Sequence, residues 1–351
     1  MKIESSQLKA FTAALLAGTG VIDSDAAIVA EVIVAASLDG VDTHGISRLP
    51  IYLSRILNGR INACPVMTIE YTGASTAIVN GGNGLGQLIA YRSMEVAVEL
   101  TKKTGIGCVA VCASNHYGAS SYFCEMATQK NLIGMAFTNT PPAIAPWGGK
   151  RPYFGTNPVA FAFPTNSDPI IVDMASSVVA RGNILKAAKE GRRIPEGWAI
   201  DAEGNPTTEA KQALAGAVLP MAGAKGYAMA LIVEILAGVV AGAAIGKNVG
   251  WIYDDKTEPT NTGHFFAAFD IERFLPYPVY LARMESMVEE IRSIPLAEGI
   301  EKIFIPGERR KNIARLRKEQ GIEVPGELMT ELNEYALEFG AELLKENLLQ
   351  S

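Results

Sequence analysis

The stretch GIGCVAVCASNHYG (residues 105–118) decides the fold that the sequence predicts. Residues 105–113 are a continuous apolar run, which is typical of a strand covered on both faces of a sheet. A helical pattern follows over residues 119–130, and a second apolar run over residues 132–138 predicts the next strand. This order predicts a strand–helix–strand unit, for which a right-handed crossover is expected.

Strands and helices continue to alternate on both sides of this unit. Further strands are predicted over residues 159–163, 170–174, 264–269 and 302–305. Helices are predicted over residues 5–17, 24–39, 178–189, 227–245 and 279–294, from about Ser47, after Pro306, and along the tail from Glu327. Residues 191–224 are rich in Gly, Pro and charge and are expected to be surface loops. The pattern as a whole predicts an α/β fold.

The composition narrows the function classes. The 37 acidic and 31 basic residues give a net charge of -6, which argues against nucleic acid as a partner. The four cysteines form no C-x-x-C pair and have no histidine at metal-ligand spacing, so we expect reduced thiols and no metal site. The N-terminus leads directly into a helix signal without the apolar core of a signal peptide, and the expected compartment is the cytoplasm.

The segment from Tyr227 to Ile245 is almost wholly apolar and approaches the length of a membrane helix. Glu234 lies in its middle, and glycines and alanines dilute its hydropathy. We therefore expect a buried helix in a large core and no membrane partner.

His116 is the strongest candidate for proton transfer. It follows the predicted strand at its carboxyl end, where open α/β sheets bind their ligands. An imidazole there can accept or donate a proton near neutral pH. From position alone, a loop histidine that only hydrogen-bonds the backbone is an equal alternative.

A second group of candidates lies at Thr43, His44, Arg48 and Tyr52. If a helix begins near Ser47, then Arg48 and Tyr52 are one turn apart and face the same way. A guanidinium can hold a carboxylate through two parallel hydrogen bonds. The alternative for Arg48 is an ordinary solvated side chain.

Three further features concern phosphate binding. The run GGNGLG (residues 81–86) is not a G-x-G-x-x-G fingerprint in a clean strand–helix context, so a Rossmann site is not predicted and a structural loop is favoured. The run PGERR (residues 306–310) places a glycine turn and arginines at a helix start, which suits an anion, although a capped helix with exposed charges is the alternative. Lys225 opens the apolar helix and offers a point charge to a phosphate.

Together these segments resemble the type-2 malate/L-lactate dehydrogenase family, which also includes ureidoglycolate and sulfolactate dehydrogenases and some cyclic imine reductases. The segments that carry the resemblance are, in order, Asp42-Thr43-His44-Gly45 with Arg48, Ser114-Asn115-His116-Tyr117-Gly118, Thr156-Asn157-Pro158, Asp173-Met174-Ala175-Ser176, Lys225-Gly226-Tyr227, Gly263-His264-Phe265-Phe266 and Pro306-Gly307-Glu308. They span about residues 5–340. Each segment alone is weak, but their order is specific.

The resemblance implies a non-Rossmann nicotinamide-binding α/β fold with a mixed central sheet and helical N- and C-terminal parts. It implies an N-terminal helical region for substrate and dimer contacts (residues 1–75) and an α/β cofactor-binding core (residues 76–270). A mainly helical C-terminal region (residues 271–351) would pack back on that core. A homodimer is the implied assembly.

The resemblance also implies an NAD(P)-dependent oxidoreductase that interconverts a 2-hydroxy acid and a 2-oxo acid. His116 would be the general acid/base, Arg48 would hold the substrate carboxylate with Thr43 and Tyr52 nearby, and His44 would lie beside the reacting carbonyl. The residues implied to contact the cofactor are Thr140, Asp173, Met174, Ala175, Lys225, Gly307, Glu308 and Arg309.

Some choices remain open. NAD is the expected cofactor, but Arg309 and Arg310 add positive charge that suits the phosphate of NADP. Malate/oxaloacetate is the expected substrate pair, with lactate, ureidoglycolate and sulfolactate as alternatives. A hydrolase that uses Thr43 or Ser114 beside a histidine would need a nucleophile–base–orienter set, and no G-x-S-x-G elbow is present. A non-catalytic metabolite-binding protein is a further alternative.

Overall fold

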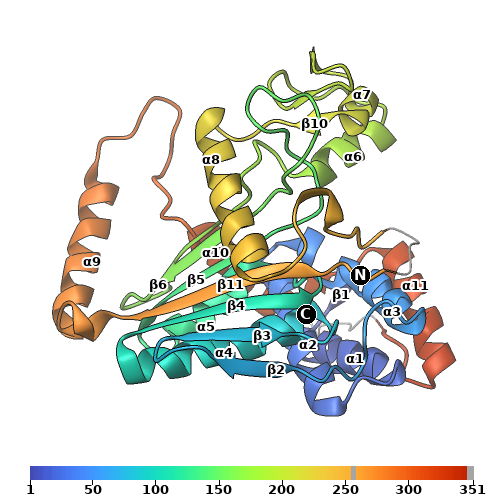
Figure 1. Cartoon of the computed structure of the whole chain (residues 1–351), viewed down its shortest axis with the longest axis horizontal. Coiled ribbons are helices and arrows are strands. Elements are labelled where there is room, and N and C mark those ends of the chain that lie inside the picture. The colour runs from blue at the N-terminus through green and yellow to red at the C-terminus, as the bar shows by residue number, and fades with distance from the viewer. Residues whose placement is uncertain (254–257, 346–351) are drawn as a thin grey trace.

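The computed structural model describes residues 1–253 and 258–345 of the chain. At its centre is a seven-stranded sheet with the order β2-β3-β4-β11-β5-β6-β7 (Figure 1). Its strands are β2 (Thr68–Tyr71), β3 (Thr76–Asn80), β4 (Ile106–Ser114), β11 (Thr262–Asp270), β5 (Leu132–Thr138), β6 (Val159–Phe163) and β7 (Ile170–Met174). β3 and β4 are parallel, and every other neighbouring pair is antiparallel. The expected α/β fold with a mixed central sheet is confirmed.

The strand–helix–strand unit around residues 105–138 is present, but its strands are not neighbours. β4 and β5 point the same way, and β11 lies between them, antiparallel to both. The adjacent parallel pair is β3 and β4, joined by α4 (Gly86–Thr104). The sequence analysis did not predict α4. The glycine-rich run 81–86 therefore does lie between a strand and a helix, which corrects our expectation about its context, although the Rossmann fingerprint is still absent.

Different helices cover the two faces of the sheet. Phe266 and Ala136 lie in a buried cluster with side chains of α4 and α5 (Ser120–Thr128). Their sequence neighbours Phe265 and Phe137 lie in a second cluster, against α8 (Ala224–Val233) and the π-helix η3 (Glu234–Val240). Successive residues of a strand point to opposite faces, so the central strands β11 and β5 are covered on both sides, whereas the edge strand β2 is exposed.

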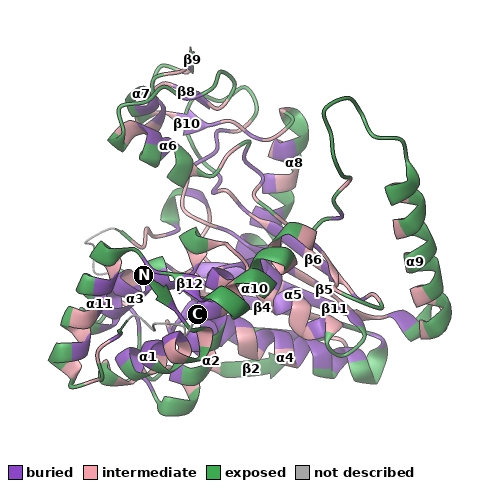
Figure 2. Ribbon diagram, turned by 180° about the vertical axis from the view of Figure 1, so that it is seen from behind, coloured by how far each residue is buried: buried purple, intermediate pink, exposed green. Residues whose placement is uncertain are grey.

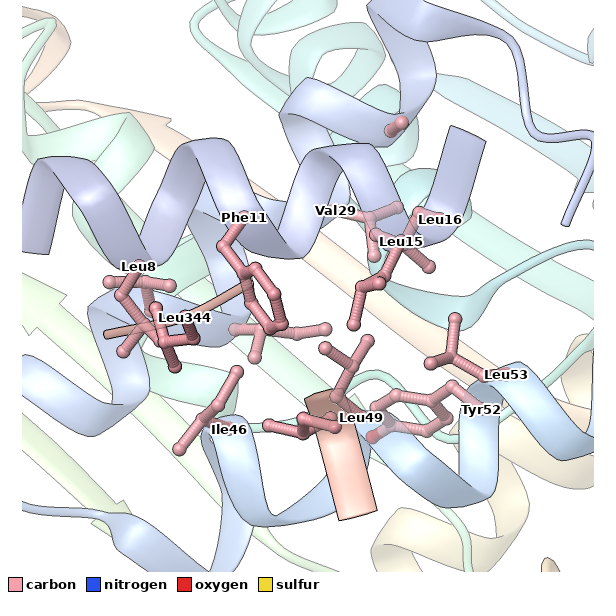
Figure 3. Packing of buried hydrophobic residues seen from close by; sticks show 14 of the residues in the cluster. Leu8, Phe11, Leu15, Leu16, Val29, Ile46, Leu49, Tyr52, Leu53 and Leu344 are labelled. Carbon is pink, nitrogen blue, oxygen red and sulfur yellow. The ribbon is translucent and has the colours of Figure 1, made fainter. Parts of the chain in front are cut away.

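A helical layer carries both ends of the described chain. It consists of α1 (Ser5–Gly18), α2 (Asp23–Leu38), α3 (Leu49–Leu57) and α11 (Gly326–Phe339), which bury one shared apolar cluster. Figure 3 shows Leu8 and Phe11 of α1 in this cluster together with Leu49 and Leu344. β1 (Lys2–Ile3) pairs with β12 (Ile322–Glu323), which ties the start of the chain to its C-terminal part. The short 3₁₀ turns η1 (Asp42–His44) and η2 (Ile46–Arg48) connect α2 to α3.

A small subdomain stands away from the main sheet in Figure 1. It contains α6 (Arg181–Lys189), α7 (Ala210–Ala215) and a three-stranded sheet of β8 (Ala199–Ile200), β9 (Pro206–Thr207) and β10 (Ala217–Val218). It has an apolar cluster of its own. Part of the segment that we expected to be loops therefore forms an ordered unit.

The apolar segment after Lys225 differs from the buried helix that we expected. The helix ends at Val240, and one side of it is open: Val239 is 59% exposed and Val240 is 53% exposed. Glu234 is buried because its carboxylate accepts hydrogen bonds from the Gly246 N–H at 2.7 Å and from the Asn157 side chain at 2.8 Å. Within residues 1–253 and 258–345, no helix has the length and apolar character that crossing a membrane requires.

The chain after β11 forms an arm. It begins with the turn η5 (Ile271–Arg273) and α9 (Tyr277–Ser293), a helix without a buried residue that stands clear of the sheet in Figures 1 and 2. The short strand predicted over residues 302–305 is wrong, because these residues have no strand partner and run irregularly into α10 (Glu308–Gln320). The turn η4 (Gly246–Asn248) precedes β11.

Candidate active site

The carboxyl ends of β4, β5 and β7 meet at one edge of the sheet. His264 of β11 is in register with Val111 of β4 and with Thr138 of β5, near the ends of both strands. β7 ends at the same edge because β6 runs antiparallel to both β5 and β7. The loop after β4 carries His116, and the segment after β5 and the end of β7 carry residues expected to contact the cofactor.

His116 is held by a side chain of the helical layer. The hydroxyl of Tyr52 lies 2.6 Å from Nδ1 of His116. Tyr52 belongs to α3, and Figure 3 shows its ring beside Leu49 and Leu53 in the apolar cluster. No group in the described part of the chain hydrogen-bonds Nε2 of His116, so this nitrogen is available to a substrate.

Burial and neighbouring charge keep His116 neutral. Burial lowers its pKa well below the ordinary value of 6.5, and His44, Arg48 and His264 lower it further. The His44 ring stacks on His116 with their centroids 5.6 Å apart and an interplanar angle of 27°. A neutral imidazole is the form that accepts a proton from a hydroxyl group.

His44 is positioned by its neighbour Thr43, whose Oγ1 lies 2.9 Å from Nδ1 of His44. Burial and the charge of Arg48 lower the pKa of His44 to about 4, while Asp173 acts in the opposite direction. His44 is therefore also neutral near pH 7.

Arg48 lies at the end of η2, directly before α3. Its Nε donates to the carbonyl of Thr43 at 2.5 Å, and its guanidinium stands over the ring of Tyr253 at 5.4 Å. Among the described residues, no carboxylate pairs with Arg48. Burial lowers the pKa of Arg48, and Tyr52 counteracts this, so the two side chains lie within electrostatic reach, as their spacing predicted. An anion bound here would supply the missing negative charge.

The third histidine, His264, has both ring nitrogens hydrogen-bonded inside the protein. His264 is fully buried, with Nδ1 2.8 Å from Oγ1 of Thr138 and Nε2 2.7 Å from Oγ of Ser114. Burial lowers its pKa to about 3. Ser114, which we considered as a hydrolase nucleophile, is itself fully buried. This Ser–His pair lies inside the sheet, where a substrate does not reach it.

Asn115 holds the loop that carries His116 in place, a role that the sequence analysis did not predict. Its side-chain nitrogen donates to the carbonyl of Gly84 at 2.8 Å, and its side-chain oxygen accepts from the Thr260 hydroxyl at 2.7 Å. These partners lie 31 and 145 positions away in the sequence, so no local signal marks them. Asn115 fixes the glycine-rich run against the loop that carries His116.

Of the residues near the end of β7 that we expected to contact the cofactor, only some are exposed. Met174 is 40% exposed at the end of β7. The Asp173 carboxylate instead accepts hydrogen bonds from the Ser121 N–H at 3.1 Å and from Arg310 at 2.9 Å. Ala175 and Ser176 follow Met174 in the chain. The carbonyl of Ser176 accepts a hydrogen bond from the Met221 N–H. This bond brings the start of α8, with the exposed Lys225, close to the end of β7.

Thr140 supports the loop after β5. Its N–H donates to the side chain of Asn157 at 3.2 Å, and its hydroxyl oxygen accepts from the Thr156 N–H at 2.9 Å. The Thr140 hydroxyl also lies 3.4 Å from the hydroxyl of Thr156, so it is tied to that residue twice.

The PGERR run lies beside β7, where the Ile171 N–H donates to the carbonyl of Pro306 at 3.0 Å. The Glu308 carboxylate accepts from the Ile305 N–H and pairs with Lys302 and Arg292. The pKa of Glu308 is lowered by these contacts, chiefly the hydrogen bond from Lys302. We expected both arginines to offer positive charge to a phosphate, and this expectation is wrong for Arg310, which is paired with Asp173. Only Arg309 of the two is exposed and available to a phosphate.

The groups at the starts of α8 and α10 suit the diphosphate of a dinucleotide. α8 and α10 each begin after a glycine with positive φ, Gly223 at 65° and Gly307 at 95°. Lys225 and Arg309 lie in the first turns of these helices and are exposed. Free N–H groups at a helix start, together with a cation, bind phosphate. Within the described residues, no three His, Cys, Asp or Glu side chains gather as a metal site.

Comparison with known proteins decides the family. A profile described as "Malate/L-lactate dehydrogenase" matches residues 3–333. The chain belongs to the malate/L-lactate dehydrogenase family. The resemblance in the ordered motifs is thereby confirmed, and with it the membership of a family of 2-hydroxy acid dehydrogenases.

Similar members of this family come from archaea. The malate dehydrogenase of Pyrococcus horikoshii is 38% identical over 350 residues, which cover 97% of this chain and 96% of the relative. The malate/(S)-sulfolactate dehydrogenase of Methanothermus fervidus is 39% identical over 343 residues, 98% of this chain and 99% of the relative. The solved structure of the sulfolactate dehydrogenase from Methanocaldococcus jannaschii has a TM-score of 0.90 and 36% identity over 98% of each chain.

Two further family members carry a cofactor in their names. The (2R)-3-sulfolactate dehydrogenase (NADP(+)) of Chromohalobacter salexigens is 36% identical over 336 residues, 95% of this chain and 98% of the relative. The ureidoglycolate dehydrogenase (NAD(+)) of Escherichia coli is 34% identical over 325 residues, 92% of this chain and 93% of the relative. Both nicotinamide cofactors are therefore named within the family.

Proposed function

We propose that this chain is an NAD(P)-dependent dehydrogenase that interconverts malate and oxaloacetate. The observation that carries the proposal is the arrangement of His116: one ring nitrogen bonds Tyr52, and the other is open beside His44 and the unpaired Arg48. A proton carrier next to an anion anchor is what a 2-hydroxy acid requires. The names of the relatives with malate as substrate support the same choice.

Each residue has a defined task in this proposal. Arg48 binds the substrate carboxylate through two hydrogen bonds and aligns the hydroxyl-bearing carbon. His116 accepts the hydroxyl proton at Nε2 during oxidation and returns it to the carbonyl oxygen during reduction. The bound carboxylate offsets the charge of Arg48, which raises the pKa of His116 toward the range useful for proton transfer. The nicotinamide cofactor, when bound, supplies or accepts the hydride.

His44 and Thr43 complete the substrate side of the site. His44 stacks against His116 and is held by Thr43, so its second ring nitrogen faces the space beside the reacting carbon. The residues proposed to hold the cofactor are Thr140, Asp173, Met174, Ala175, Lys225, Gly307, Glu308 and Arg309. Asp173 contributes mainly by holding Arg310 and the start of α5. NAD is the proposed cofactor, with NADP as the alternative that Arg309 favours.

We further propose a homodimer, in which a second copy of the chain covers the arm and the open side of α8 and η3. α9 is a helix of 17 residues without a buried side chain. Most of the stability of a helix in a protein comes from packing of its apolar face, so α9 needs a packing partner. The open side of α8 and η3 exposes Leu231, Ile232, Ile235, Val239 and Val240. Light scattering coupled to size-exclusion chromatography should give twice the chain mass, and a monomer would contradict the proposal.

The activity is tested by following absorbance at 340 nm with NADH or NADPH and a panel of 2-oxo acids. The panel should contain oxaloacetate, pyruvate and 3-sulfopyruvate, because one relative is named for both malate and sulfolactate. We expect the highest kcat/KM with oxaloacetate and NADH. Absence of oxidation with every 2-oxo acid and both cofactors would overturn the proposal.

A further inference from the structure

The segment that carries His44 and Arg48 is short and irregular. We call residues 42–48 the substrate turn; it consists of η1, Gly45 and η2. The hydrogen bonds of 3₁₀ turns have poorer geometry than those of an α-helix, so such turns depend on contacts with neighbouring elements. The contacts that hold the substrate turn therefore decide where His44 and Arg48 point.

The end of α2 supports the substrate turn from one side. The hydroxyl oxygen of Ser37, a buried residue of α2, accepts a hydrogen bond from the Ile46 N–H at 2.9 Å. Gly45 lies so close to this helix that a Cβ there would be 2.1 Å from the same hydroxyl oxygen. The turn and the helix end are thus in direct contact through Ser37.

Arg317 of α10 joins the same two elements from the other side. Its Nη1 donates to the carbonyl of Ser37 and to the Asp42 carboxylate, and its Nη2 donates to the second carboxylate oxygen at 3.0 Å. The carbonyl of Asp42 in turn accepts from the hydroxyl of Ser47, the residue before Arg48, at 2.5 Å. One guanidinium therefore holds the first residue of the substrate turn against the end of α2.

α10 also packs on the connection that leads into the turn. Gly40 has a positive φ of 74°, and a Cβ there would lie 3.0 Å from two carbon atoms of Ile313. Ile313 stands one helical turn before Arg317, so both side chains lie on the same face of α10. An apolar contact and a guanidinium thus act on the same short segment.

The first turn of α10 is fixed to the sheet. Nη1 of Arg310 donates to the Asp173 carboxylate at 2.9 Å and to the Ser121 hydroxyl at 2.6 Å. Ser121 belongs to the first turn of α5, which follows the loop that carries His116. Arg310 and Arg317 are about two helical turns apart. α10 therefore connects the part of the sheet beside His116 to the substrate turn.

The pair of Arg317 and Asp42 fits a role in geometry better than one in stability. The Asp42 side chain is 58% exposed, and ion pairs at exposed sites add little to the free energy of unfolding. Two parallel hydrogen bonds from a planar guanidinium do fix the orientation of a carboxylate. The pair should therefore restrict where the turn lies without greatly changing the melting temperature.

We propose that Arg317 is a positioning residue: it holds Asp42 against the end of α2 and so fixes the substrate turn with Arg48 and His44 facing His116. The proposal rests on the proposed function, because the alignment matters for a 2-hydroxy acid bound between Arg48 and His116. A displacement of 1 Å by a residue far from the chemistry can cost roughly 10²-fold in rate.

Steady-state kinetics with the 2-oxo acid that the wild type reduces best is the first test. Arg317→Ala should raise the KM of this acid and lower its kcat/KM by about tenfold, a part of what a 1 Å displacement can cost. The KM of NADH should not change, because the start of α10 stays bound to the sheet through Arg310. Wild-type kinetics, or a loss of kcat with both KM values unchanged, as in a partly unfolded sample, would overturn the proposal.

The matched control is Arg315→Ala. Arg315 lies on the same helix and pairs with Asp168, which stands between β6 and β7 and carries no proposed role in the site. This variant also removes one exposed Arg–Asp pair from α10. It should keep the wild-type KM for the acid, and a rise equal to that of Arg317→Ala would show that any loss of charge from α10 has the same effect.

A double-mutant cycle tests whether Arg317 acts through Asp42. If the two residues work as one unit, Arg317→Ala combined with Asp42→Ala should cost no more kcat/KM than the more severe single variant. Arg317→Lys keeps the charge but not the parallel bonds, so it should recover only part of the loss. Additive losses in the double variant would contradict a shared role.

Histidine ¹⁵N NMR reads the position of the substrate turn without any substrate. Burial lowers the pKa of His44 to about 4, so its ring should stay neutral in the wild type from pH 8 down to pH 5.5. The charged and titratable groups that face this ring are Arg48, Asp173, Arg310 and His116. A turn that moves away from α2 exposes the ring to water, which raises its pKa.

Two variants separate this movement from a direct charge effect. Loss of the Arg317 charge alone would raise the pKa of His44, whereas loss of the Asp42 charge alone would lower it. We expect His44 to become protonated within the same pH range in both Arg317→Ala and Asp42→Ala, and to stay neutral in Arg315→Ala. A His44 ring that stays neutral in either of the first two variants would overturn the proposal.

The positioning role and the proposed function fail separately. If the wild type reduces no 2-oxo acid, the proposed function fails while the NMR experiment still decides whether Arg317 fixes the turn. If activity is present and neither the KM of the acid nor the His44 signal depends on Arg317, the positioning role fails and the proposed function stands.

Discussion

The hydroxyl of Tyr52 bonds Nδ1 of His116 at 2.6 Å although the two residues are 64 positions apart. Tyr52 belongs to the helical layer that also carries His44 and Arg48, whereas His116 belongs to the edge of the sheet. The proposed anion anchor and the proposed proton carrier therefore come from different layers, and one hydrogen bond joins them. Perturbations on either side of this bond should be separable by kinetics.

Replacing His116 by glutamine should abolish proton transfer while keeping a polar side chain of similar size. We expect kcat to fall by about 10²–10⁴-fold, the usual contribution of general acid–base catalysis. Cofactor affinity, measured by NADH fluorescence titration, should not change, because the residues proposed to hold the cofactor lie after β5, at the end of β7 and at the starts of α8 and α10. A variant with wild-type turnover would remove His116 from the mechanism.

Arg48 should act through substrate binding. Arg48→Ala removes the proposed partner of the carboxylate, and loss of a charged hydrogen bond of about 1.5–3 kcal/mol predicts a fall of kcat/KM by roughly 10–100-fold. Arg48→Lys keeps the charge but not the two parallel bonds, so it should recover only part of the loss. Initial rates with oxaloacetate measure both variants. Arg193→Ala, an exposed arginine paired with Glu209, is the control and should behave as wild type.

Much of this fold was predictable because buried strands are local signals. The runs that became β4, β5, β6 and β7 are continuous and apolar, as strands covered on both faces must be. The insertion of β11 between β4 and β5 was not predictable, because β11 begins more than a hundred residues later and nothing in the run 262–270 names its neighbours. α4 was missed because it is buried on several sides, so its apolar residues do not form the single stripe that marks an amphipathic helix.

In the proposed site, too, the residues with a local sequence signal were predictable, and those whose partners are distant in the sequence were not. His116, His44 and Arg48 stand in recognisable local patterns, and the structure brings them together. The role of Asn115 in supporting the loop that carries His116 was not recognised, because its partners are distant in the sequence and an amide carries no chemistry that a short motif would display. The pairing of Arg310 with Asp173 likewise joins residues 137 positions apart.

His264 should make the protein less stable in acid. Burial lowers its folded pKa to about 3, against 6.5 for an exposed histidine. Between these values the unfolded chain binds more protons than the folded one, so the free energy of unfolding rises with pH and is lost as the pH falls below 6.5. The loss is about 1.4 kcal/mol per pH unit across this window for one such group.

Urea unfolding at pH 7, 6 and 5 and constant protein concentration measures this dependence. His264→Gln can still bond Ser114 and Thr138 but does not titrate, so its unfolding free energy should fall less steeply with acid than that of the wild type. Some slope should remain, because His116 and His44 also have lowered pKa values. Parallel curves for the two proteins would show that His264 does not contribute.

Gly86 should be intolerant of a side chain because of the loop it contacts. A Cβ at this position would lie 2.1 Å from the carbonyl oxygen of Asn115 and 2.5 Å from that of His116, so Gly86→Ala must displace the backbone that carries the proposed proton acceptor. Overpacking of this kind costs about 1–3 kcal/mol of stability, and the shift of His116 should lower kcat together with it. Gly182→Ala is the matched control: it also lies in the first turn of a helix, but a Cβ there meets nothing within 4 Å. The control should keep wild-type kcat and gain slightly in stability, since alanine is the better helix former. Thermal unfolding and malate oxidation separate the two variants, and equal behaviour would show that the close approach of α4 to the catalytic loop does not constrain His116.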